Sequence, residues 1–208
     1  MHVVLFDIDG TLLNAGGAGQ RAMEAALERL FGATRPVHGI STAGRTDRAI
    51  VADLFAFYGI ACSPENVALF LAEYLRRLPQ ELSAMPGMVL PGVSELLAAL
   101  ALRDDVLLSL LTGNFRRGAE IKLRYHGLHG HFVAGGFGDD DHDRDDVARM
   151  AVASVAEHLG DDRASGQLWV IGDTPSDVKC GRAVGARVVA VATGMYSAEE
   201  LRATFPDH

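Results

Sequence analysis

Two carboxylates separated by one residue, Asp7 and Asp9, directly follow a short apolar run, and a Gly10-Thr11 turn comes after them. Side chains alternate along an extended strand, so we expect both carboxylates to project to the same side where the strand ends. Two carboxylates held close repel each other unless a cation or a shared proton relieves them. Because a strand gains no stability from such a pair, the spacing indicates a chemical role.

Two further apolar runs also end in polar clusters. Val106–Leu111 is followed by Thr112-Gly113-Asn114, and Leu168–Ile171 is followed by a segment that contains Asp173 and Asp177. In open parallel sheets, ligands bind outside the carboxyl ends of the strands. If the three strands are neighbours, their carboxylates meet in one crevice, where a hard divalent cation such as Mg²⁺ relieves the repulsion. Mg²⁺ with carboxylates and a phosphate oxygen is typical of phosphoryl-transfer sites.

Strand and helix patterns alternate along most of the chain, which predicts an α/β fold with a doubly wound (Rossmann-like) parallel sheet. We expect residues 1–14 and 85–208 to form this α/β core. The predicted strands are Val3–Phe6, Val106–Leu111, His131–Ala134, Leu168–Ile171 and Val188–Val191. The predicted core helices run from Pro91-Gly92 to Leu102 and over Phe115–Tyr125, Asp145–Leu159 and Pro175–Val184.

Residues 15–84 show only helical patterns and are predicted to form an inserted α-helical domain. An apolar period of 3.6 residues predicts a helix over Gln20–Phe31. Thr46 is expected to cap a second helix that ends near Tyr58, and Ser63 is expected to cap a third.

Composition excludes several functional classes. The 208 residues carry 19 Lys and Arg against 27 Asp and Glu, a net charge of −8, which disfavours partners such as nucleic acid or a membrane surface. The two cysteines, Cys62 and Cys180, match no zinc spacing, and we interpret both as buried free thiols. Without an N-terminal signal pattern or an apolar run of bilayer length, a cytoplasmic location is expected.

The order of the three polar clusters, with a helical insertion after the first, carries a resemblance to a known family. The chain resembles the haloacid dehalogenase-like hydrolase superfamily in three motifs. They are Asp7-Ile8-Asp9-Gly10-Thr11-Leu12, Leu111-Thr112-Gly113-Asn114 and Gly172-Asp173-Thr174-Pro175-Ser176-Asp177. It is most similar to the phosphoglycolate-phosphatase-like branch, whose members carry a helical cap.

The resemblance implies a role for each cluster. Asp7 would be the nucleophile that forms an aspartyl-phosphate, and Asp9 the general acid and then the base. Thr112 would hold phosphoryl oxygens. The resemblance implies that Mg²⁺ is held by Asp7, Asp9 (through its backbone carbonyl), Asp173 and Asp177. The residues expected to line the substrate site are Gly10, Thr11, Gly113, Asn114, Arg45 and Lys122.

One family feature is missing, because most members carry a lysine in the stretch that corresponds to residues 138–146. Here that stretch contains only Arg144 among acids, and arginine can bind phosphate in its place. Lys122 is the alternative, although its place on an amphipathic helix is more typical of a surface lysine. Arg45, in the inserted segment, either contacts substrate or pairs with Asp47 or Asp53.

The sequence therefore predicts a Mg²⁺-dependent phosphatase of a small phosphorylated metabolite, with phosphoglycolate as the first choice. A phosphosugar mutase would use the same Asp7 and Asp9, and an inactive interaction protein on this fold is a further alternative. A dehalogenase or phosphonate hydrolase is disfavoured because Asp9 would be superfluous for either. Monomer and homodimer both remain open.

Overall fold

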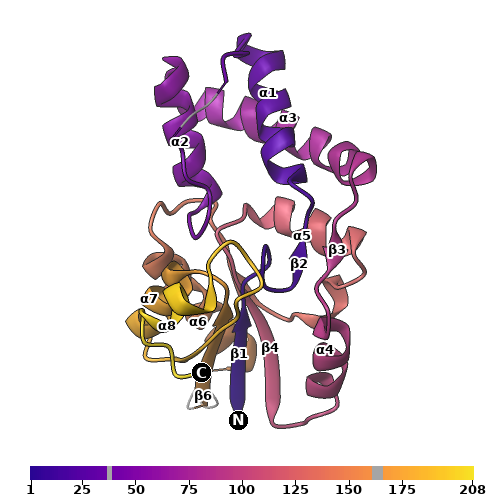
Figure 1. The fold of residues 1–208 in the computed structure, drawn as a ribbon, viewed down its shortest axis with the longest axis vertical. Helices are drawn as coiled ribbons and strands as arrows, with labels where there is room; N and C mark the ends of the chain where they lie inside the picture. The colour runs from indigo at the N-terminus through magenta and orange to yellow at the C-terminus, as the bar shows by residue number, and fades with distance from the viewer. Residues whose placement is uncertain (37–38, 161–165) are drawn as a thin grey trace.

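A five-stranded parallel sheet forms the centre of the computed structural model, which describes residues 1–36, 39–160 and 166–208 (Figure 1). The strand order is β5-β4-β1-β6-β7. The strands are β1 (His2–Phe6), β4 (Val106–Leu111), β5 (Gly135–Gly136), β6 (Gln167–Gly172) and β7 (Arg187–Ala190). In the register, Phe6 is paired with Leu110 on one side and with Ile171 on the other. The three strands that end in polar clusters are therefore neighbours, and the predicted meeting of their ends is confirmed.

Helices cover both faces of the sheet, as expected for a doubly wound fold. The alternation along β1 sends Val4 and Phe6 to one face and Val3 and Leu5 to the other. The first face packs against α4 (Val93–Ala101) and α5 (Arg116–Tyr125), and the second against α6 (Arg144–Leu159) and α7 (Pro175–Ala183). A single 3₁₀ turn, η1 (His129–His131), and the short α8 (Ala198–Arg202) complete the described elements of this part.

Three helices are inserted between the first strand and the rest of the sheet: α1 (Ala18–Phe31), α2 (Asp47–Tyr58) and α3 (Pro64–Ala84). Thr46 and Ser63 accept hydrogen bonds from the N–H groups of Ala49 and Asn66, so both predicted caps are confirmed. We call residues 15–84 the helical segment. Figure 1 shows it beyond the carboxyl ends of the strands.

The chain leaves and re-enters the α/β part through an antiparallel pair of very short strands, β2 (Leu13–Asn14) and β3 (Met88–Val89). Strands of two residues have no readable period, so the sequence does not predict them. None of the described helices has the length and apolar content needed to cross a membrane.

The predicted strand over His131–Ala134 is wrong, because η1 occupies its start and β5 follows at Gly135–Gly136. A Cβ on Gly136 would lie 2.3 Å from the carbonyl oxygen of Val147 in α6, so close helix packing requires glycine there. The prediction for Cys62 is also wrong, since it is exposed, whereas Cys180 is buried; both are free thiols.

Candidate active site

Three buried carboxylates from two strand ends meet at the centre of the site. Asp7 follows β1, Asp173 follows β6, and Asp177 lies in the first turn of α7. Oxygens of these three side chains lie within 4.8 Å of one another, and the residues are only 6%, 3% and 1% exposed. Sequence reasoning placed all three here.

Local hydrogen bonds fix the two carboxylates that follow β6. Thr174 and Asp177 form a capping box at the start of α7, in which Asp177 Oδ2 accepts from the N–H and the hydroxyl of Thr174. The Thr11 hydroxyl donates to Asp173 Oδ1 at 3.0 Å. Thr11, which is expected to contact substrate, orients the Asp173 carboxylate through this bond.

Two glycines lie directly against the second oxygen of Asp173. A Cβ on Gly10 would lie 2.4 Å from Asp173 Oδ2, and a Cβ on Gly194 would lie 1.7 Å from it. Gly10 also has a φ of +85°, which strongly favours glycine. Gly194, which was not predicted, therefore belongs to the backbone that shapes this corner of the site.

Arg144, at the start of α6, is the cation beside the three carboxylates. Its Nη1 lies 3.4 Å from Asp7 Oδ1, and its Nη2 pairs with Asp177 Oδ1 and contacts the Leu111 carbonyl oxygen. The residue is 6% exposed. The structure thus brings Arg144 to the end of β1, where the sequence argument placed a replacement for the missing lysine.

One guanidinium does not compensate this amount of buried negative charge. Burial raises the pKa of Asp7 to about 8; Arg144 opposes the shift, and the carboxylates of Asp177 and Asp173 add to it. Burial, with the charge of Asp177, also raises the pKa of Asp173 to about 6. A set of carboxylate oxygens that lacks positive charge fits a hard divalent cation such as Mg²⁺.

Asp9 faces a second cation rather than the carboxylate cluster. Its Oδ2 accepts from Lys122 Nζ at 2.6 Å and from Asn114 Nδ2 at 2.8 Å. Lys122 Nζ also donates to Asn114 Oδ1 at 2.6 Å. The interpretation of Lys122 as a surface residue is therefore wrong. It is 5% exposed, on the buried face of α5 that also carries Ala119 and Leu123.

Thr112 is fully buried and does not line the cavity described below. Its Oγ1 accepts hydrogen bonds from the backbone N–H and the side-chain amide of Asn114, at 3.3 and 2.9 Å. The hydroxyl that is expected to hold phosphate thus also anchors the asparagine that contacts Asp9.

A cavity of about 610 Å³ lies between the strand ends and the helical segment. Residues of the α/β part on its wall include Asp7, Asp9, Gly10, Gly113, Asn114, Lys122, Arg144 and Asp173. Those of the helical segment include Gln20, Met23, Glu24, Arg45, Asp47, Ile50, Leu54 and Tyr74. The expected ion pair of Arg45 is confirmed, because its Nη1 lies 2.7 Å from Asp53 Oδ2, and Arg45 also lines the cavity.

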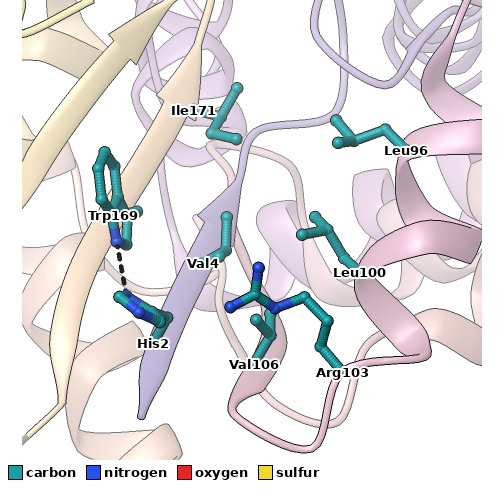
Figure 2. Close-up of a pocket in the computed structure, with 8 residues that line it drawn as sticks. All are labelled: His2, Val4, Leu96, Leu100, Arg103, Val106, Trp169 and Ile171. Atoms are coloured by element: carbon teal, nitrogen blue, oxygen red, sulfur yellow. Dashed lines mark hydrogen bonds between the residues drawn. The ribbon is translucent and has the colours of Figure 1, made fainter.

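A second, smaller cavity of about 280 Å³ lies between α4 and the sheet (Figure 2). Its wall is mainly apolar and includes Val4, Leu96, Leu100 and Ile171. None of the carboxylates described above reaches it. The chemistry therefore belongs to the larger cavity.

The sequence pattern of the haloacid dehalogenase-like hydrolase family matches residues 4–182, and the chain belongs to this family. No curated protein matches the chain in sequence.

Solved structures share the fold over nearly the whole chain. A predicted phosphoglycolate phosphatase from Haemophilus somnus has a TM-score of 0.70 and 17% identity, over 99% of this chain and 91% of that one. CbbY from Rhodobacter sphaeroides, in complex with phosphate, has a TM-score of 0.69 and 19% identity, over 95% of this chain and 88% of that one. A putative beta-phosphoglucomutase from Thermotoga maritima has a TM-score of 0.62 and 22% identity, over 98% of this chain and 91% of that one.

Proposed function

We propose that this protein is a Mg²⁺-dependent phosphatase that hydrolyses a small phosphomonoester through an aspartyl-phosphate on Asp7. One observation carries the proposal. In the cavity below the helical segment, Asp7 lies between a buried guanidinium and two further carboxylates, and Asp9 follows at the same strand end. This arrangement can hold a phosphoryl group, neutralise its charge and supply both a nucleophile and a proton donor.

In the first step, a carboxylate oxygen of Asp7 attacks phosphorus, and the bond from phosphorus to the leaving oxygen breaks. Asp9 gives its proton to that oxygen. In the second step, Asp9 takes a proton from water as the water attacks phosphorus, which releases phosphate and restores the Asp7 carboxylate. Asp7, Asp173 and the Asp9 backbone carbonyl, with Asp177 next to them, would hold Mg²⁺, which would supply positive charge against the phosphoryl oxygens.

The hydrogen bonds of Asp9 within the described residues engage only one of its two carboxyl oxygens. Lys122 and Asn114 both hold Oδ2, and the side chain of Asp9 is 40% exposed on the cavity side. Within the described residues, no hydrogen bond engages Asp9 Oδ1. That oxygen is therefore available to the leaving group.

We further propose that the helical segment acts as a cap domain over the α/β core. It supplies about half of the cavity wall, including the apolar side chains of Met23, Ile50 and Leu54. Such a cover excludes water while the aspartyl-phosphate forms, and it contacts the part of the substrate that differs between phosphomonoesters.

Phosphoglycolate is the first substrate that we propose, in keeping with the predicted phosphoglycolate phosphatase of the same fold. A phosphosugar mutase is the second candidate, because a putative beta-phosphoglucomutase shares the fold and the same acids would serve it. The two differ in their products: a phosphatase releases phosphate, whereas a mutase returns a phosphorylated isomer.

The proposal is tested by phosphate release from phosphoglycolate, sugar phosphates and nucleoside monophosphates, each with Mg²⁺ and with a chelator. We expect release only with the metal. Isomerised sugar phosphate without release would favour the mutase. Turnover of none of them by the folded protein would favour the inactive interaction protein.

Mg²⁺ is expected to stabilise the fold, independently of turnover. A ligand that binds only the folded state at 100 times its Kd adds about 2.7 kcal/mol to the free energy of unfolding. Thermal unfolding with and without Mg²⁺ measures this, and Asp173→Asn should remove most of the increase. An equal increase in the variant would mean that the ion binds elsewhere.

Lys122→Met is expected to lower kcat by about 10²-fold, because Asp9 loses its buried counter-ion and part of its orientation. Lys179→Met is the matched control, since that lysine is 65% exposed in its pairs with Asp143 and Asp145. Phosphate release under saturating substrate compares the two. Equal kcat values would show that Lys122 does not serve Asp9.

A further inference from the structure

Asp47 joins the helical segment to the loop that follows β4. It is the first residue of α2, it is 8% exposed, and it forms hydrogen bonds through both its backbone and its side chain. Its N–H donates to the Gly113 carbonyl oxygen at 2.7 Å, and its Oδ2 accepts from the Phe115 N–H at 2.8 Å. These two bonds bracket Asn114, the residue whose amide contacts Asp9.

The residues next to Asp47 pack against two loops and the first turn of α7 so closely that the glycines at these contacts admit no side chain. A Cβ on Gly113 would lie 2.0 Å from the Arg45 carbonyl oxygen, and a Cβ on Gly138 would lie 2.9 Å from the Thr46 side chain. A Cβ on Gly44 would lie 2.7 Å from Ser176 Oγ. Figure 1 shows the loop before α2 reaching down to this part of the chain. Asp47 is thus the polar centre of a close-packed junction.

The charge of Asp47 acts on the same ammonium that holds Asp9. Burial raises the pKa of Asp47 to about 6, and Lys122 and the Phe115 N–H oppose the shift. Although burial lowers the pKa of Lys122, the carboxylates of Asp9 and Asp47 more than reverse this, so the pKa is raised. Asp47 and Asp9 therefore stabilise one shared cation from the two sides of the cavity.

We propose that Asp47 is a positioning residue that docks the helical segment on the loop 113–115 and thereby holds Asn114 and Lys122 against Asp9. The inference rests on the proposed function, because Asp9 is the group whose orientation matters. It adds a role for a residue that touches neither the nucleophile nor the carboxylate cluster. Asp47→Ala would leave the backbone bond to Gly113, but the loop would lose the side-chain acceptor at the Phe115 N–H and the charge that acts on Lys122.

The test compares Asp47→Ala, which removes the acceptor, with Asp47→Asn, which keeps an oxygen for the Phe115 N–H. Glu65→Ala is the matched control, because Glu65 is an exposed acid in the first turn of α3. Two readouts are taken: kcat and KM for p-nitrophenyl phosphate with Mg²⁺, and hydrogen exchange of the Phe115 amide in the intact protein. The second readout needs no turnover.

We expect Asp47→Ala to lower kcat by about 10- to 100-fold and to speed exchange of the Phe115 amide. Asp47→Asn should retain most of the protection of that amide, with a smaller loss of kcat, and Glu65→Ala should match the wild type in both readouts. If Asp47→Ala does not fold, the comparison is between Asp47→Asn and Glu65→Ala. A lower kcat in Asp47→Asn would support the positioning role of Asp47, and equal kcat values would overturn it.

Unchanged kcat in folded Asp47→Ala would overturn the proposal, and so would a loss of kcat without faster exchange at Phe115. Both results would leave the phosphatase assignment standing. If the wild type releases no phosphate, the proposed function fails, whereas the exchange readout still decides whether Asp47 docks the segment.

Discussion

Asp7→Asn is expected to reduce kcat by at least about 10⁴-fold, because an amide oxygen is a poor nucleophile and the covalent intermediate cannot form. The substitution keeps the size of the side chain. It also removes one of three buried carboxylates, the one whose pKa is raised by burial and by the charges of Asp177 and Asp173. The free energy of unfolding without metal should therefore stay equal to that of the wild type or increase.

Phosphate release and thermal unfolding of the same preparation measure both effects. Asp146→Asn is the control, since Asp146 is an acid on α6 whose side chain is 51% exposed. A folded Asp7→Asn protein that keeps more than about one hundredth of the wild-type kcat would contradict the nucleophile assignment.

Arg144→Ala is expected to lower the free energy of unfolding by about 3–5 kcal/mol, the usual cost of removing one partner of a buried ion pair. Asp7 and Asp177 would lose their only shared guanidinium among the described residues. Activity should fall as well, because losing Arg144 raises the pKa of Asp7 further and keeps the nucleophile protonated.

The control for Arg144 is Arg149→Ala on the same helix, where an arginine 59% exposed pairs with Asp146. Exposed pairs of this kind contribute about 0–1 kcal/mol. Chemical denaturation of both variants separates the two cases. Equal, small losses for Arg144→Ala and Arg149→Ala would show that the guanidinium does not hold the carboxylate cluster together.

The carboxylate cluster could be predicted from sequence because its parts follow strands with clear apolar runs. β1, β4 and β6 are each bounded by polar turns, and their carboxyl ends align once the strands are parallel neighbours. Local patterns and one topological rule were sufficient for these carboxylates. Arg144 was reached in another way, through the family resemblance, because it stands in the stretch where most members carry a lysine.

Contacts across the cavity were not predictable in this way. Lys122 and Asp47 lie on different elements, and each is buried because the other side of the cavity supplies a partner of opposite charge. A charged residue on an amphipathic helix carries no sign of such a partner in its own neighbourhood. The sequence gives one weak sign that Lys122 is buried, because Ala119 and Leu123 lie on the same face of the helix and are apolar.

Glycines account for the other differences. Gly136 lies in β5 although glycine is unfavourable in strands, because α6 packs against its backbone. Gly194 shapes the corner beside Asp173 from a loop that shows no motif. In both cases glycine is required because a segment distant in the sequence approaches its backbone closely.

The most direct test of the central claim is to trap the covalent intermediate. The protein with Mg²⁺ is mixed with a phosphate-labelled substrate from the panel, quenched in acid during turnover, digested, and searched for labelled peptides. We predict an acid-stable, hydroxylamine-sensitive phosphate on the peptide that contains Asp7, absent from Asp7→Asn. Steady phosphate release with no labelled peptide, or with the label on another residue, would contradict the account.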